Sequence, residues 1–511
     1  MEFTEVRMRN LGSSPVGEIY EGLTHNFYDV KEPAFSDKEK KFALLLERLI
    51  QRKEDVSELA SIDNLSDSFL DLFRDEIISV VEINGLLERM PSKKIFLALK
   101  TSLVKILDEV KFVADKELFA EYILHNSIGL KKLSFFSLDD NLEELMVNNL
   151  DSVFVFHRKL GMCKTNISLE EKMFVNLVHR IAFSVGKEFN IKDPLLDARL
   201  PDGSRVNATS SDVSPRGNSL TIRKFAPVPL TVLDLIENNT ITSESAAFLW
   251  VMTEGLGLTP QNMLVTGGTA SGKTTLLNVL ANFARISDRV VSIEDTLEIS
   301  LLDRDNWVAL EAQHSRDCEI TMNDLLKNSL RMRPDRIIVG EVRGPEALTL
   351  FSAMDSGHAG CLGTIHANDS REAIIKLEEK PLEVPQSMLP LVDLIIVMQR
   401  HYSRERGIHR RVVQISEVTR MENKVLLADV YDYSDETDKL KRTEVPSHLM
   451  EEVARKNSID KTKLKMEIES RKLILEWMMA KGIREPREVL EVIQSYYYSP
   501  DKVKAAIYSS R

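Results

Sequence analysis

Three patterns of apolar and polar positions follow one another along the 511-residue chain. In the first, Ser36 and Glu39 form a capping box, and apolar side chains spaced three and four residues apart follow as far as Ile50. The same spacing returns over residues 69–81 and 96–107. We therefore expect residues 1–125 to form a helical N-terminal extension whose apolar stripes pack into a bundle.

The second pattern covers residues 126–224 and consists of short runs in which apolar and polar residues alternate, such as 153–156 and 220–223, separated by turn signals. It predicts an α+β N-terminal domain. Pro227 and Pro229 then exclude a regular helix or a central strand, because proline lacks the amide donor that either structure needs. We expect a linker over residues 225–235.

In the third pattern, over residues 236–511, continuous apolar runs alternate with segments of helical spacing. Continuous runs between helices are typical of strands buried on both faces, so an α/β domain with a mostly parallel sheet is predicted. A helical tail follows. The predicted strands are 263–266, 290–293, 336–339 and 394–398.

Composition narrows the class of protein. The chain carries 67 Lys and Arg against 79 Asp and Glu, a net charge of −12, so no nucleic acid is expected as a partner. Three cysteines, Cys163, Cys318 and Cys361, are too few for a disulfide framework and favour a cytoplasmic protein. The first residues are acidic, unlike a signal peptide, and the longest apolar run, 246–252, is far shorter than the ~20 residues of a membrane span. Membrane contact is therefore expected to be peripheral.

Residues 267–274 match the pattern G-x-x-x-x-G-K-[ST] between a predicted strand and a predicted helix. In such a loop glycines let backbone N–H groups surround phosphates, Lys273 neutralises the β and γ oxygens, and the Thr274 hydroxyl binds Mg²⁺. The sequence predicts an ATP site with Mg²⁺. Its expected residues are Gly267, Gly268, Thr269, Ala270, Ser271, Gly272, Lys273, Thr274 and Thr275.

Carboxylates at two predicted strand ends complete a catalytic set. Glu341 follows the strand 336–339 and is our candidate general base for activating water. Gly340 stands where many P-loop ATPases have a magnesium-binding Asp, so another acid has to complete the metal's surroundings. The candidates are Glu294, Asp295 and Glu298, with a solvated strand end as the alternative.

His358 and His366 flank the short run 359–365. Together with Cys361 they count as three zinc ligands, but no fourth ligand is near and a strand would separate them. We favour one phosphate sensor and one structural residue, with His366 the better candidate for the sensor.

The motifs at 267–274, 293–296, 333–343 and 357–368 resemble, in order, the Walker A, Asp box, atypical Walker B and His box of the type II/type IV secretion ATPase superfamily. Segments 197–207 and 221–225 resemble the superfamily's N-terminal domain. The chain has too few cysteines for the four-cysteine zinc insert of many members. It is most similar to the archaeal branch, the motor ATPases of the archaellum.

This resemblance implies a RecA-like P-loop domain and a homohexameric motor that couples ATP hydrolysis to interdomain motion, driving assembly, and in some cases rotation, of a surface filament. It implies that arginines of the N-terminal domain reach the phosphates. Arg205 and Arg223 match best, with Arg199, Arg216 and Arg343 as further candidates alongside His358.

The implied partner is an integral-membrane platform protein at the inner face of the cell membrane. The basic segment 461–511 is either a contact for anionic lipid or a helical cap on the P-loop domain. Two other functions remain open: a nucleic-acid translocating or conjugation ATPase, and a nucleotide-sensing scaffold without turnover.

Overall fold

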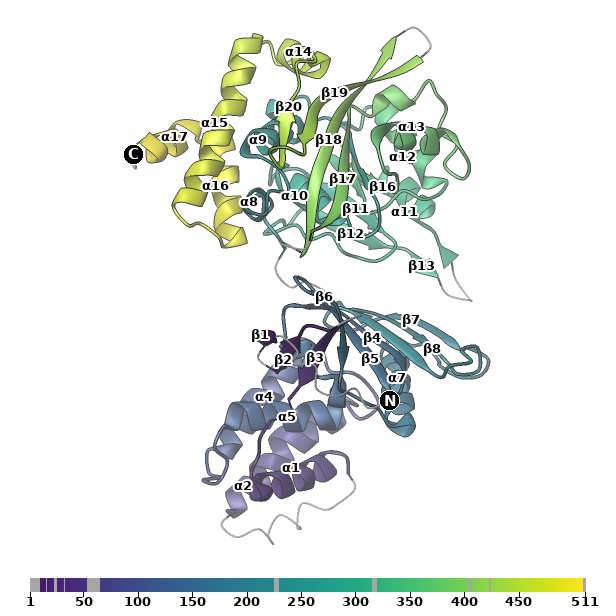
Figure 1. Ribbon diagram of the computed structural model, residues 1–511, viewed down its shortest axis with the longest axis vertical. Helices are drawn as coiled ribbons and strands as arrows, with labels where there is room; N and C mark the ends of the chain where they lie inside the picture. The colour runs from purple at the N-terminus through teal and green to yellow at the C-terminus, as the bar shows by residue number, and fades with distance from the viewer. Residues whose placement is uncertain are drawn as a thin grey trace. The chain divides into compact units, whose positions relative to one another are not determined.

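The computed structural model describes residues 10–508 except 15, 23–24, 32, 53–64, 225–228, 315–318, 404–406 and 422–423. The chain divides into two compact units, Met1–Ala226 and Pro227–Arg511 (Figure 1). The division falls inside the predicted linker 225–235, and the first four residues of that linker lie outside the described residues. Helix α8 (Val232–Glu237) already begins within the predicted linker.

A nine-stranded sheet forms the centre of the first unit, in the order β1-β2-β3-β6-β5-β4-β9-β8-β7. Neighbouring strands are antiparallel except β3 and β6, which are parallel. Helix α7 (Glu171–Ser184) buries its apolar face in the same core as the sheet. The strands are β1 (Asn10–Ser14), β2 (Gly17–Tyr20), β3 (Asn26–Val30), β4 (Leu142–Asn149), β5 (Ser152–His157), β6 (Gly161–Thr165), β7 (Leu195–Arg199), β8 (Arg205–Thr209) and β9 (Ser219–Arg223).

The remaining helices of this unit are inserted between β3 and β4; α1 to α5 have a separate core, while η3 and α6 pack into the core of the sheet. The predicted capping box is present, since Ser36 accepts from the Glu39 amide and Glu39 accepts from the Ser36 amide. The elements are α1 (Asp37–Ile50), a continuous helix of α2 (Asp67–Leu72), the π-helical η2 (Phe73–Ile78) and α3 (Ser79–Ile83), α4 (Lys93–Leu107), α5 (Lys116–Ile128), the 3₁₀ turn η3 (Lys131–Leu133) and α6 (Phe135–Leu138).

The prediction of an entirely helical extension over residues 1–125 is wrong for residues 10–30. Strands β1 to β3 lie there, and β3 joins them to the sheet of the predicted α+β domain. The signal in the sequence is weak because each strand spans only four or five residues. In β2, burial alternates over just Gly17 to Tyr20, too short a stretch to stand out before the long helical pattern that follows.

The second unit confirms the predicted α/β fold. Its sheet has the order β12-β11-β15-β16-β10-β17-β18-β19-β20, in which β12 to β17 are parallel and β17 to β20 antiparallel. The strands are β10 (Met263–Gly267), β11 (Val290–Glu294), β12 (Trp307–Glu311), β15 (Arg336–Val339), β16 (Leu362–Ile365), β17 (Leu394–Ser403), β18 (Gly407–Met421), β19 (Lys424–Ser434) and β20 (Lys439–Arg442), with β13 (Gln313–His314) and β14 (Glu319–Ile320) as a separate pair. The four predicted strands are β10, β11, β15 and β17.

Two apolar clusters cover the two faces of this sheet. One contains α8, α9 (Ser243–Glu254), α10 (Lys273–Asn282), α14 (His448–Lys456), α15 (Lys461–Ala480), α16 (Pro486–Tyr498) and α17 (Pro500–Tyr508). The other contains α11 (Met322–Ser329), α12 (Glu346–Asp355) and α13 (Ser370–Glu378). Two 3₁₀ turns, η4 (Gly255–Gly257) and η5 (Leu389–Leu391), precede β10 and β17. No helix among the described residues is long and apolar enough to cross a membrane.

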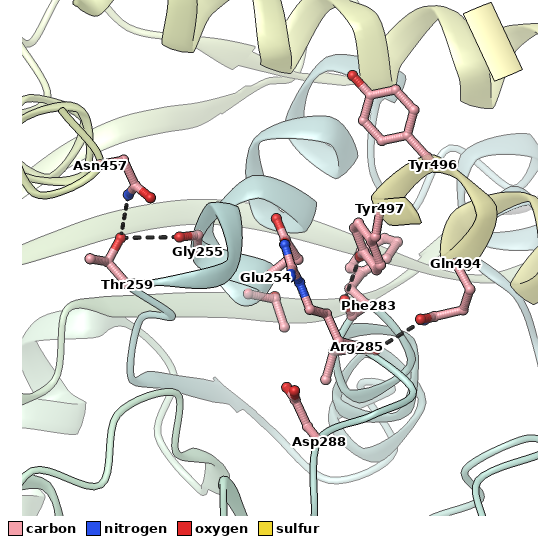
Figure 2. A network of polar contacts seen from close by, with 12 residues as sticks. Glu254, Gly255, Thr259, Phe283, Arg285, Asp288, Asn457, Gln494, Tyr496 and Tyr497 are labelled. Carbon is pink, nitrogen blue, oxygen red and sulfur yellow. Dashed lines mark hydrogen bonds and ion pairs between the residues drawn. The ribbon is translucent and has the colours of Figure 1, made fainter. Parts of the chain in front are cut away.

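Residues 461–508 pack as a helical cap, as one of the two interpretations predicted. Helix α15 packs against α9, and α16 contacts the end of the P-loop helix α10 (Figure 2). The Tyr497 hydroxyl donates to the Phe283 carbonyl and accepts from the Trp250 indole, while Gln494 donates to the Ala284 carbonyl. The carbonyls that end α10 are therefore satisfied by the C-terminal helices, which form part of the core rather than a loose tail.

Candidate nucleotide-binding site

Parallel strands bring the predicted site residues to one edge of the sheet. Strands β10, β11, β15 and β16 run in the same direction, so their carboxyl ends meet at that edge. The loop 267–274 leaves β10, Glu294 ends β11, Glu341 follows β15 and His366 follows β16. Ligands of open α/β sheets bind outside the carboxyl ends of the strands, which makes this edge the candidate site.

The loop 267–274 needs its glycines. Gly267 has φ +151°, and a Cβ there would lie 2.3 Å from the Met398 carbonyl oxygen and 2.6 Å from Ser271 Oγ. Gly272 has φ +96° and Ala270 φ +57°, so the backbone turns repeatedly through the left-handed region. Such turns aim successive N–H groups inward and form an anion-binding concavity.

Polar groups of this loop fit a phosphate ligand. Helix α10 begins at Lys273, so its first-turn N–H groups at Thr274 and Thr275 face the loop. The Ser271 hydroxyl is buried and has no hydrogen-bond partner among the described residues. Lys273 Nζ donates to the carbonyl oxygens of Gly267 (2.8 Å) and Gly268 (3.1 Å), which hold the ammonium within the loop. A bound phosphate would replace these weak carbonyl acceptors with charged oxygens.

Burial lowers the pKa of Lys273, and the nearby Glu341 carboxylate opposes that shift. Burial raises the pKa of Glu341, but a hydrogen bond and charge from Arg343, together with the charges of Lys273 and His366, bring it below its usual value. Glu341 is therefore ionised at neutral pH, as a general base has to be.

Arg343 connects two of the predicted carboxylates. Its Nη2 donates to Glu341 Oε2, and its Nη1 lies 3.5 Å from Asp295 Oδ2. The hydrogen bond from Arg343 to Glu341 raises the pKa of the guanidinium. Asp295 and Glu341, from two different strand ends, thus share one cation.

Glu294 differs from the other acids because it is only 2% exposed. Its Oε1 accepts from the backbone amides of Glu298 (2.8 Å) and Ile299 (2.9 Å), while its Oε2 has no partner among the residues described. Burial raises its pKa to about 7. A Cβ at position 340 would lie 2.8 Å from Glu294 Cγ, which explains why glycine precedes Glu341.

The two histidines lie at opposite ends of β16. His366 Nε2 is 3.1 Å from the Thr269 hydroxyl of the P-loop. The Thr266 hydroxyl donates to the Ala367 carbonyl and accepts from the Ala367 amide. His358 precedes β16, and its carbonyl accepts from the buried Cys361 thiol. The strand separates His358 from the P-loop of its own unit, so within this unit only His366 of the pair lies at the candidate site.

Three of the four arginines predicted in the first unit form one row across its sheet. Arg199 lies opposite Arg205, and Arg205 lies opposite Arg223. Opposed residues of antiparallel strands point to the same face, so three guanidinium groups stand side by side. Arg199 Nε donates to the Gly203 carbonyl, and Arg223 lies 3.7 Å from Glu144, its cross-strand neighbour. Like charges in this arrangement are unfavourable unless an anion accompanies them.

Arg216 does not join that row. It lies exposed in the connection between β8 and β9, at the end of these strands opposite to Arg205 and Arg223. Its selection as a companion of the other arginines is therefore corrected: the hairpin itself holds it apart.

Sequence reasoning missed Arg410, whose Nε donates to the Ala270 carbonyl at 3.0 Å. Nothing in the sequence reveals which side of the sheet β18 occupies or that its register brings Arg410 to a loop 140 positions earlier.

The family described as "Type II/IV secretion system protein" matches residues 137–481, well over half of the chain. The chain therefore belongs to the type II/IV secretion system protein family. This match confirms the superfamily recognised from the four motifs.

Named relatives extend over different parts of the chain. An uncharacterized protein of Methanocaldococcus jannaschii is 48% identical over 247 residues, covering 47% of this chain and only 34% of that relative. A second uncharacterized protein of the same organism is 30% identical over 488 residues, covering 93% of this chain and 85% of that protein. The probable conjugal transfer protein TrbB of Sinorhizobium fredii is 33% identical over 294 residues, covering 56% of this chain and 86% of TrbB.

Proposed function

We propose that the chain is a motor ATPase that hydrolyses ATP to ADP and phosphate and couples hydrolysis to movement of its two units about the linker. The observation that carries this proposal is the meeting, at one sheet edge, of a phosphate-binding loop, Lys273 and the ionised Glu341. A binding site alone does not need a carboxylate whose pKa is held low beside the loop.

The residues divide the chemistry between them. The loop amides and Lys273 bind the β- and γ-phosphates, and Thr274 with Asp295 and Glu298 would hold Mg²⁺, which supplies charge neutralisation on the phosphates. Glu341 accepts a proton from the attacking water as the γ-phosphoryl group leaves ADP. His366, tied to Thr269, reports whether the γ-phosphate is present. The row of Arg205 and Arg223 supplies further positive charge to the developing transition state.

The machine that this ATPase drives is, in our proposal, an assembly apparatus for an archaellum or type IV pilus-like filament. The chain acts as a homohexamer, peripheral to the inner face of the cell membrane, and transmits its motion to an integral-membrane platform protein. The order and spacing of the Walker A, Asp box, Walker B and His box motifs, together with the family match, support this role. Rotation of the filament would be an elaboration of the same motion.

A conjugation ATPase is the second candidate, favoured by the likeness to the probable conjugal transfer protein TrbB. The net charge of −12 weighs against direct transport of nucleic acid, because translocating channels are lined by cations.

ATP turnover measured beside the solution mass tests the proposal. We expect a non-hydrolysable ATP analogue to raise the light-scattering mass toward six subunits, and anionic liposomes, but not DNA, to stimulate hydrolysis. Salt-sensitive stimulation by DNA would favour the conjugation ATPase instead. ATP binding without turnover, in the presence of liposomes as well, would leave a nucleotide-sensing scaffold and reject the motor.

A further inference from the structure

A two-stranded wall rises beside the P-loop on the side away from Glu341. Strand β17 pairs with β10 up to Gly267, which lies opposite Met398, and then continues past the end of β10 to Ser403. Strand β18 pairs with this extension of β17. The wall is thus built from the same rigid sheet that positions the loop.

Two arginines of this wall face the loop. Arg400 and Arg410 lie directly opposite one another on β17 and β18, as do Met398 and Val412, each two positions away on its strand. Met398 and Val412 belong to the apolar cluster that contains α10, and residues two positions apart on a strand point to the same face, so Arg400 and Arg410 also face that side. The side chain of Arg410 confirms the direction: its Cδ would lie 3.1 Å from a Cβ at Gly272.

No carboxylate among the described residues pairs with Arg400 or Arg410, and Arg410 has only the neutral Ala270 carbonyl as its acceptor. Two like charges directly opposite one another weaken a sheet. The exposed Arg400 and the half-buried Arg410 are therefore placed as an anion site would place them, beside the candidate phosphate-binding loop.

We propose that Arg400 and Arg410 bind the α-phosphate and the nucleoside side of ATP. The inference rests on the proposed function and names a part of the nucleotide that the motifs leave without a partner. Glu341 and His366 follow β15 and β16, on one side of β10, and the reacting γ-phosphate must lie toward them. The rest of the nucleotide then leaves the loop on the other side, where β17 and β18 stand.

Before nucleotide binds, Arg410 keeps the Ala270 carbonyl occupied and so holds the loop in its turned conformation. On binding, the guanidinium exchanges this neutral acceptor for a phosphate oxygen, a stronger charge-assisted bond. Arg400, for which the described residues supply no carboxylate partner, neutralises the same phosphate from the adjacent strand.

Equilibrium binding to the full chain separates this role from that of the P-loop. The probes are Mg²⁺-ATPγS, Mg²⁺-ADP and Mg²⁺-pyrophosphate, because pyrophosphate lacks the α-phosphate and the nucleoside. We expect R400Q and R410Q each to weaken ATPγS and ADP binding about tenfold or more, the size expected for one lost charged hydrogen bond. Pyrophosphate binding should change less than about threefold, and R410K should recover part of the affinity because it keeps the charge.

K424Q is the matched control, since the exposed Lys424 begins β19 opposite Met421, at the far end of β18 from Arg410, and its substitution removes the same charge. Its affinity for all three probes should equal that of the wild type. Thermal unfolding without ligand identifies any variant that fails to fold. Wild-type affinity for ATPγS in R400Q, or an equal loss of pyrophosphate and ADP affinity in R410Q, would overturn the inference. A wild-type chain that binds no ATPγS would overturn the proposed function itself.

Discussion

The second unit's sheet has an amino edge and a carboxyl edge, where the corresponding ends of its parallel strands meet. The two edges differ in how their buried polar and charged groups are paired. At the amino edge Glu254, only 1% exposed, accepts from Arg285 Nε (2.8 Å) and Nη2 (2.6 Å) and from Arg471 Nη2 (3.2 Å), as Figure 2 shows in part. At the carboxyl edge Lys273 has only carbonyl acceptors, and the buried oxygens Ser271 Oγ and Glu294 Oε2 have no partner among the described residues.

This contrast separates architecture from function within one fold. Paired charges at the amino edge fasten α15 to α9 and to the end of α10, because the buried Glu254 of α9 binds both Arg285 and Arg471. Unsatisfied groups at the carboxyl edge are stable only if a ligand completes them for part of the cycle. Disrupting each edge should therefore produce a different kind of defect.

The largest effect should come from the arginine row of the first unit. We expect R205Q and R223Q each to lower the ATPase rate by about 10³-fold or more, the size associated with an arginine that stabilises a transferring phosphoryl group. R216Q is the matched control, because Arg216 lies exposed at the other end of the same strands. Steady-state hydrolysis measures the effect, and equal rates for R216Q and R223Q would contradict it.

E341Q should remove turnover and keep binding. Glutamine is nearly isosteric but accepts no proton at neutral pH, so kcat should fall by about 10²- to 10⁴-fold while the affinity for ATPγS stays near that of the wild type. E378Q, at the exposed end of α13, is the control. A normal rate in E341Q would move the general base elsewhere at this edge.

At the amino edge the expected defect is one of stability. E254Q removes the buried carboxylate that joins Arg285 to Arg471, and breaking a buried ion pair in this way costs about 3–5 kcal/mol of unfolding free energy. E467Q removes a more exposed partner of the same Arg471 and should cost less than about 1 kcal/mol. Denaturant unfolding of the full chain compares the two. An ATPase defect in E254Q without loss of stability would break the distinction between the edges.

Local signals allowed much of the second unit to be predicted. Strands β10, β11, β15 and β17 were visible as continuous apolar runs, and the loop 267–274 is specified by residues within one short segment. Strands β1 to β3 were missed, since their identity depends on pairing with β6 more than a hundred residues later.

The same limit applies to the site. Glu341 and Lys273 were found because each belongs to a motif, whereas Arg410 acts through the register of a nine-stranded sheet that no local pattern encodes. His358 is the opposite case. It is close to His366 in sequence, but β16 extends between them and places them at opposite ends of the strand.

Glu294 supplies the smallest and most specific prediction. Burial raises its pKa to about 7, from a model-peptide value near 4.3, so the folded chain keeps a proton that the unfolded chain has lost between these pH values. Stability from this group is fully present below about pH 4.3, falls by at most ~1.4 kcal/mol per pH unit as pH rises, and levels off above pH 7. Asp393, whose pKa burial also raises to about 7, adds a similar slope at the amino edge.

Unfolding free energies measured from pH 5 to 8 should therefore fall less steeply in E294Q than in the wild type, and D393N should show the same flattening. If Mg²⁺-ATPγS flattens the wild-type slope but leaves that of E294Q unchanged, the proton on Glu294 is linked to the nucleotide. An E294Q slope equal to that of the wild type would show that Glu294 is already ionised at neutral pH, and that the carboxyl edge tolerates a buried carboxylate oxygen without a ligand to complete it.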